Sequence, residues 1–181
     1  KTMTQRSNTK MQDLITILTP LHYRLKYVRR QLEHTESLNC TRLVIDSSKS
    51  CNRDYLNGFD VAYLHYPDCL YYKKIFRALG HVTTPYVMHL PDDDIVLKRG
   101  LISCLELLEN EPTLIGAAGF QARLRENSKQ LDFRYRRLQF LWDRALMSIF
   151  YFPSSTFWLQ AKAFLGFYEA NQFVYRTEIL R

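Results

Sequence analysis

Three consecutive carboxylates, Asp92, Asp93 and Asp94, are the residues of this sequence best suited to chemistry. They follow the apolar segment 86–90 directly and precede a stretch with helical periodicity. Carboxylates one or two positions apart supply the oxygen ligands that a hard divalent cation prefers, and leave further positions for phosphate oxygens and water. The alternative is a solvated turn whose aspartates cap the next helix. An EF-hand loop is a poor fit, because Leu97 stands at its sixth position, where that loop needs glycine.

The segments around this triplet alternate between strand and helix patterns, which predicts an α/β fold. Apolar side chains at three- and four-residue steps over 10–34 predict a helix that Pro20 bends or divides. Strands are expected at 42–45, 59–64, 86–90 and 114–120, and helices at 69–79 and 99–110. Ligands of an open parallel sheet bind outside the carboxyl ends of its strands, so we expect the triplet to face a ligand site.

Composition and charge limit the classes of protein that remain. The 181 residues include 25 basic and 18 acidic side chains, and the formal charge of +7 indicates an anionic partner. A hydrophobic content of 46% argues against a disordered chain. The longest strongly apolar run, 145–152, is too short to cross a membrane. Four cysteines without a C-x-x-C pair offer no zinc spacing and favour a reducing compartment, with two disulfides as the alternative.

The segment 82–97, which contains the triplet, resembles the metal-binding DxD region of GT-A glycosyltransferases, particularly the family 2-like bacterial and viral enzymes. Other segments are similar to that family in the same order. Segment 3–7 resembles the end of the family's first strand, and segment 43–48 resembles its second strand. Segment 71–79 resembles the helix before DxD, and segment 175–180 resembles a later strand-to-helix junction. The resemblance implies the Rossmann-like GT-A fold, with a mostly parallel central sheet flanked by helices and a nucleoside diphosphate sugar as donor.

The resemblance also implies that the triplet holds the cofactor. Asp93 and Asp94 would bind Mn²⁺ or Mg²⁺ on the diphosphate of the donor, and Asp92 would contact the ribose or the metal. The commonest family form has its first acid where this chain has Pro91, so the choice of direct ligand among the three stays open. Such a cation is needed because negative charge develops on the departing diphosphate as the bond to the sugar breaks.

Four further residues are implied at the nucleotide. Asp46 and Thr4 correspond to positions that contact the base or the ribose. Lys74 and Arg6 correspond to positions that could approach the nucleotide. The alternatives are a solvated helix face for Lys74 and a surface loop for Arg6.

One domain is expected over 1–181, with a nucleotide-sugar-binding half at 1–120 and a basic, aromatic acceptor-side segment at 121–181. Within it, the basic residues interleaved with aromatics from Phe133 to Tyr168 predict an acceptor platform, an interfacial helix on an anionic membrane, or core aromatics with solvated arginines. An inverting enzyme needs a carboxylate base, which the resembled family carries after the junction at 175–180. Because this sequence stops at Arg181, we assign no catalytic residue and expect a chain truncated at its C-terminus.

The sequence thus predicts a metal-dependent, inverting glycosyltransferase that moves a sugar to a saccharide, lipid-linked or protein acceptor. We expect it in the cytoplasm, with peripheral association with a membrane. The alternatives are an inactive GT-A scaffold module and a basic nucleic-acid-binding domain. A nucleic-acid partner is not expected, because the triplet would repel a phosphate backbone unless a metal intervened. A nucleotidyltransferase fits less well, since no second acidic strand is found.

Overall fold

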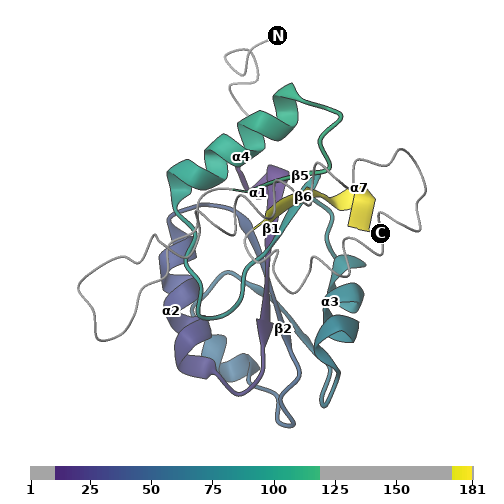
Figure 1. Cartoon of the computed structure of the whole chain (residues 1–181). Coiled ribbons are helices and arrows are strands. Elements are labelled where there is room, and N and C mark those ends of the chain that lie inside the picture. The colour runs from purple at the N-terminus through teal and green to yellow at the C-terminus, as the bar shows by residue number, and fades with distance from the viewer. Residues whose placement is uncertain (1–10, 119–172, 181) are drawn as a thin grey trace, which may run out of the picture. The chain divides into compact units, whose positions relative to one another are not determined.

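The computed structural model describes residues 11–118 and 173–180 of the chain. These residues form a six-stranded sheet with the strand order β3-β2-β1-β4-β6-β5 (Figure 1). The strands are β1 (Ile15–Leu21), β2 (Thr41–Asp46), β3 (Ala62–His65), β4 (Tyr86–His89), β5 (Gly116–Ala118) and β6 (Phe173–Arg176). The helices are α1 (Met11–Leu14), α2 (Leu25–Glu36), the 3-10 helix η2 (Arg53–Leu56), α3 (Tyr71–Leu79), α4 (Lys98–Asn110) and α7 (Thr177–Leu180).

Most of the sheet is parallel. β1 pairs in parallel with both β2 and β4, and β2 pairs in parallel with β3. β6 pairs antiparallel with both β4 and β5. The predicted α/β class, with a mostly parallel sheet flanked by helices, is therefore confirmed.

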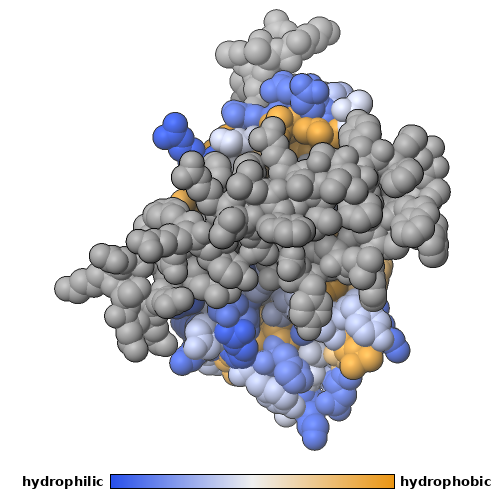
Figure 2. Space-filling view, in the orientation of Figure 1, coloured by the Kyte–Doolittle hydropathy of each residue, from blue (hydrophilic) through white to orange (hydrophobic). Residues whose placement is uncertain are grey.

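Helices cover both faces of this sheet, and alternate residues of β1 pack toward different helices (Figure 1). Ile17 belongs to the core cluster that contains the apolar face of α4, and Leu21 to the cluster that contains α2. Leu18 packs with the apolar side chains of α3 on the opposite face. The described surface visible in Figure 2 is mostly hydrophilic, with small hydrophobic areas between, as expected when the large apolar side chains fill these clusters.

β1 occupies 15–21 of the segment 10–34, where a helix bent or divided by Pro20 was expected, so that prediction is wrong for 15–21. All seven residues of β1 are buried, as in a parallel strand with helices on both faces. Alternate residues of a strand form hydrogen bonds to the neighbours on opposite sides, and Leu18 and Pro20 both face β4. Pro20 fits this strand because the pairing with β4 already ends at Leu18. No ladder bond to β4 therefore needs the missing N–H. The second half of the prediction is confirmed by α2.

The other predicted elements are present with shifted ends. β3 begins at Ala62, three residues later than expected, and β5 is confined to Gly116–Ala118. β6 and α7 confirm the strand-to-helix junction expected at 175–180. Most of the segment 121–181 lies outside the described residues, so the division into two functional parts stays a prediction. Within the described ranges, every helix is too short or too polar to cross a membrane.

Candidate functional site

The carboxyl ends of the parallel strands form the candidate site. β1, β2 and β4 run in the same direction, so the loops that follow them meet at one edge of the sheet. β2 lies on one side of β1 and β4 on the other, which makes the gap between β1 and β4 a switch in strand order. Open α/β sheets bind their ligands in the crevice at such a switch. The loop 22–24 and the turn after β4 flank this position.

The acidic triplet forms the turn after β4. The main-chain N–H of Asp94 donates to the carbonyl of Pro91 at 3.0 Å and closes the turn. Asp92 is only 5% exposed, whereas Asp93 is exposed to solvent. Burial raises the pKa of Asp92 to about 6, although Arg24 favours its charged form. The alternative of a fully solvated turn is therefore wrong for Asp92.

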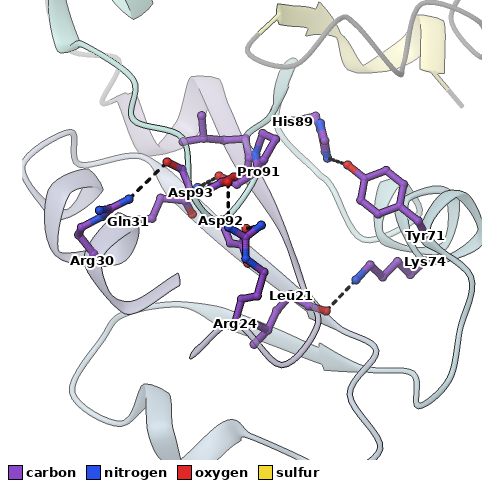
Figure 3. A network of polar contacts seen from close by, with 11 residues as sticks. Leu21, Arg24, Arg30, Gln31, Tyr71, Lys74, His89, Pro91, Asp92 and Asp93 are labelled. Atoms are coloured by element: carbon purple, nitrogen blue, oxygen red, sulfur yellow. Dashed lines mark hydrogen bonds and ion pairs between the residues drawn. The ribbon is translucent and has the colours of Figure 1, made fainter. Parts of the chain in front are cut away.

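Arg24, in the loop between β1 and α2, bridges the first two carboxylates of the triplet (Figure 3). Its Nη1 lies 3.1 Å from Oδ1 of Asp92, and its Nη2 lies 2.8 Å from Oδ2 of Asp93. The ring of Tyr27 lies beside the guanidinium, with its centroid 4.6 Å away. One guanidinium thus balances two adjacent carboxylates. Arg24 could not be selected from the sequence, because the helix expected over 10–34 concealed its position three residues after a strand.

α2 also holds the main chain of the acidic turn. Nε2 of Gln31 donates to the carbonyls of the two residues before the triplet, one of them at 3.2 Å. Its Oε1 accepts the hydroxyl of Thr19 at 2.6 Å, which joins the turn to β1. Arg30 donates to the carbonyl of Asp93 at 3.4 Å (Figure 3). The turn is therefore positioned by side chains from a different element, and its conformation does not depend on Arg24 alone.

Asp46 ends β2 and is fully buried. Its Oδ1 accepts the N–H of Ser48 at 2.8 Å, and its Oδ2 accepts Nδ2 of Asn52 at 2.8 Å and the hydroxyl of Tyr63 at 2.7 Å. Burial opposes ionisation, but these three hydrogen bonds outweigh it and hold the pKa of Asp46 below its ordinary value. Asp46 therefore organises the loop after β2. Its predicted contact with a base or ribose stays a prediction.

Lys74 reaches the same edge from α3. Its Nζ donates to the carbonyl of Leu21 at 2.7 Å and to Oγ of Ser47 at 2.9 Å, so it joins the ends of β1 and β2. The side chain is 2% exposed, so the alternative of a solvated helix face is wrong. Burial lowers the pKa of Lys74 to about 8, although Asp46 and Asp92 favour its charged form.

The structure therefore brings Asp46, Lys74 and the acidic turn to one edge of the sheet. Thr4 and Arg6 lie outside the described residues, so their roles stay predictions. The strand end and loop expected at 3–7 also lie outside the described residues, so that expectation stays a prediction. The first strand of the described residues is β1, and the loop 22–24 follows it.

The carboxylates of the turn fit a divalent cation in part. Within 11–118 and 173–180, no three His, Cys, Asp or Glu side chains are grouped so that they could hold a metal ion. Oxygens of Asp92 and Asp93 nevertheless converge on a single positive group, the guanidinium of Arg24. Two hard oxygen donors that share one cation are a suitable donor set for Mn²⁺ or Mg²⁺ when phosphate and water complete the shell. A role for Asp94 stays a prediction.

Comparisons with known proteins give a likeness of fold. The sequence matches no protein-family model, and no curated protein is significantly similar to it. The structure is similar to a mannosyltransferase, PcManGT from Pyrobaculum calidifontis in complex with GDP-Man and Mn²⁺, with a TM-score of 0.51 and 16% identity over 59% of this chain. Two structures of S. aureus TarS give TM-scores of 0.49 and 0.44, with 12% and 15% identity over 65% and 54% of this chain.

The described residues thus have the α/β fold of GT-A-type glycosyltransferases, as the resemblance in sequence implied. The chain covers 35% of the mannosyltransferase and 40% and 20% of the two TarS structures. It therefore spans well under half the length of these proteins.

Proposed function

We propose that this chain carries the nucleotide-sugar-binding part of a metal-dependent glycosyltransferase. The observation that carries the proposal is the convergence of Asp92 and Asp93 on one positive charge, at the switch in strand order of a GT-A-type sheet. A ligand in that crevice meets two carboxylates through a cation, with the buried ammonium of Lys74 at the same edge. The GDP-Man and Mn²⁺ bound by the similar mannosyltransferase support a GDP-sugar as one donor to test.

In this proposal Asp92 and Asp93 hold Mn²⁺ or Mg²⁺, with Asp94 as a further ligand. The bound cation neutralises diphosphate oxygens as the bond to the sugar breaks. Lys74 ties the ends of β1 and β2 together through Leu21 and Ser47, and so keeps the crevice in shape. Asp46 fixes the loop after β2, beside which the nucleoside is proposed to lie.

The rest of the reaction is proposed on the resemblance. The acceptor is a saccharide, a lipid-linked saccharide or a protein, and the transfer inverts the anomeric centre with a carboxylate base that takes the acceptor proton. We also propose a cytoplasmic location, and the formal charge of +7 supports peripheral association with an anionic membrane surface.

Binding of nucleotide sugars to the full chain tests this function. We expect one member of a panel of UDP- and GDP-sugars to raise the Tm when Mn²⁺ is present and not when EDTA replaces it. A ligand at a hundred times its Kd stabilises by about 2.7 kcal/mol, which raises the Tm of a domain of this size by about 5 to 10 °C.

Matched variants identify the site. Asp92→Asn and Asp93→Asn should each abolish the rise in Tm. The exposed Asp60 lies just before the amino end of β3, at the opposite edge of the sheet, so Asp60→Asn should keep it. The proposal is wrong if no nucleotide sugar stabilises the chain with either cation, or if Asp60→Asn removes the effect as well.

A further inference from the structure

The guanidinium of Arg24 stands where the proposed function needs a cation. Each of its terminal nitrogens contacts a different carboxylate, Asp92 at 3.1 Å and Asp93 at 2.8 Å. These are single contacts to two carboxylates, and they lack the paired bonds to one carboxylate that make the strongest arginine ion pairs. A divalent cation bound to the same two oxygens would face the positive charge of Arg24 at close range. The guanidinium and the divalent cation cannot occupy these same two oxygens at once.

We propose that Arg24 and a divalent cation occupy Asp92 and Asp93 in turn, and that the displaced guanidinium binds the diphosphate of the incoming nucleotide. This inference rests on the proposed function for its second half, the diphosphate. Its first half concerns only the chain and the cation. Arg24 then serves both as the counter-ion of the empty site and as a binding residue of the filled one.

The main chain of the acidic turn is held independently of Arg24, whereas the side chain of Arg24 can move. Gln31 and Arg30 hold the main chain of the acidic turn, and neither contact passes through Arg24. The main-chain carbonyl of Arg24 accepts two N–H groups of the first turn of α2, from Tyr27 at 3.0 Å and Val28 at 3.3 Å, which anchors its backbone. Its side chain is 45% exposed and carries several rotatable bonds. Exchange therefore needs only a change of rotamer.

The surroundings of Arg24 favour an anion once the carboxylates are taken. Lys26 and Arg30 lie near the same Tyr27 ring, with their charged groups 4.8 Å and 5.5 Å from its centroid. Once the guanidinium leaves the carboxylates, it lies beside these two positive charges and is stabilised by a negatively charged ligand in the crevice. The two oxygens of a phosphate match the fork of an arginine as a carboxylate does. Cation and nucleoside diphosphate should therefore strengthen each other's binding, because the second gives the displaced arginine a new partner.

Titration of the full chain with Mn²⁺ alone, followed by electron paramagnetic resonance of the unbound ion, tests the exchange. Arg24→Gln should bind Mn²⁺ more tightly than the wild type, by about tenfold, within the usual range of coupling between sites. Arg24→Lys keeps a charge without the fork and should fall between the two. The matched control is Arg29→Gln, since Arg29 is exposed on α2 and pairs with Glu33 at 3.2 Å. It should behave as the wild type does.

A second titration with GDP or UDP present tests the role at the diphosphate. The nucleotide should tighten Mn²⁺ binding to the wild type and to Arg29→Gln, and much less to Arg24→Gln. Equal or weaker binding of Mn²⁺ alone by Arg24→Gln overturns the exchange, as does a lack of Mn²⁺ binding by every variant. An unchanged effect of the nucleotide in Arg24→Gln overturns the contact with diphosphate. If no nucleotide binds at all while Arg24→Gln still gains affinity for Mn²⁺, the proposed function is wrong and the exchange stands.

Discussion

Tyr63 of β3 donates its hydroxyl to the buried carboxylate of Asp46 at the end of β2, at 2.7 Å. The register places Tyr63 beside Val44 and His65 beside Asp46, so the tyrosine reaches along its neighbour to the next residue on the same face. Asn52 completes the pair of hydrogen bonds on the same oxygen. A charge that would be costly in the core is thereby kept ionised and ties the loop after β2 to the edge strand.

Tyr63→Phe should lower the free energy of unfolding by about 1.5 to 3 kcal/mol at neutral pH, because it removes a hydrogen bond to a charged group. The hydrogen bonds keep the pKa of Asp46 below its ordinary value in the folded state, so their stabilisation is full above the pKa of the unfolded chain, near 3.9. It is lost as the pH falls through the lower, folded value. The difference between the two proteins should therefore shrink in acid. Urea unfolding at pH 7 and below pH 4 measures it.

Tyr66→Phe is the control for that experiment. The hydroxyl of Tyr66 lies 3.5 Å from Nε2 of His81 at the surface, so its loss should change stability by less than about 0.5 kcal/mol. An equal loss in both variants would mean that the bond to Asp46 is not the cause.

Gln31→Leu should loosen the acidic turn. The leucine leaves the carbonyl of Leu90 without its amide donor and the hydroxyl of Thr19 without its acceptor, at a cost of about 1 to 3 kcal/mol. Hydrogen exchange of the Asp94 amide, which closes the turn onto Pro91, should become faster.

The surface position Glu33 on the same helix provides the comparison. Glu33 pairs with Arg29 across one helical turn, and both side chains are about half exposed. Glu33→Gln should therefore cost less than about 0.5 kcal/mol and leave exchange at Asp94 unchanged. Faster exchange at Asp94 in both variants would show that Gln31 has no special hold on the turn.

The helices α3 and α4 were predictable from sequence because their patterns are local. α3 and α4 show a single apolar stripe, and their bounds differ from the expected ones by one or two residues at the start. β1 was not predictable in the same way. It is buried on both faces, so it lacks a two-residue period, and the four-residue step from Leu21 to Leu25 continues its apolar spacing into the stripe of α2.

Site residues were predictable where their position after a strand determines their role. They were not predictable where their role depends on a contact with a residue far away in the sequence. Asp92 and Asp93 could be selected because acids directly after an apolar strand lie at the binding edge. Arg24 contacts Asp93 across 69 positions of sequence, and nothing in its own neighbourhood marks that contact. Lys74 was selected, but its burial between the ends of β1 and β2 follows only from the packing of α3 on the sheet.

Comparison of the wild type with Lys74→Met at two pH values should show how much stability the buried ammonium of Lys74 costs. The pKa of Lys74 is about 8 in the folded chain against 10.5 for an ordinary lysine, a difference worth about 3 kcal/mol. Between these values the unfolded chain holds a proton that the folded chain has lost, so the free energy of unfolding rises with pH. The wild type should therefore gain stability relative to Lys74→Met between pH 8 and 10, measured by urea unfolding at both. The exposed neighbour Lys73 serves as control, and Lys73→Met should track the wild type.

Two glycines should respond to alanine in opposite directions. A Cβ at Gly116 of β5 would lie 2.9 Å from Cδ1 of Tyr175 and 3.1 Å from the carbonyl oxygen of Val174. β6 pairs with both β5 and β4, so the carbonyl cannot withdraw without disturbing the antiparallel side of the sheet. Gly116→Ala should therefore cost about 1 to 3 kcal/mol, as other overpacked sites do.

At Gly100 in α4, a Cβ would meet nothing within 4 Å, and the backbone is helical. Gly100→Ala should stabilise by up to about 1 kcal/mol, because alanine loses less conformational freedom than glycine when the helix forms. Thermal unfolding of the two variants measures the contrast, with a lower Tm for Gly116→Ala and an equal or higher one for Gly100→Ala. A similar Tm for both would mean that β5 and β6 do not approach each other as closely at Gly116 as the sheet requires. The close pairing of β6 with the parallel strands would then need another explanation.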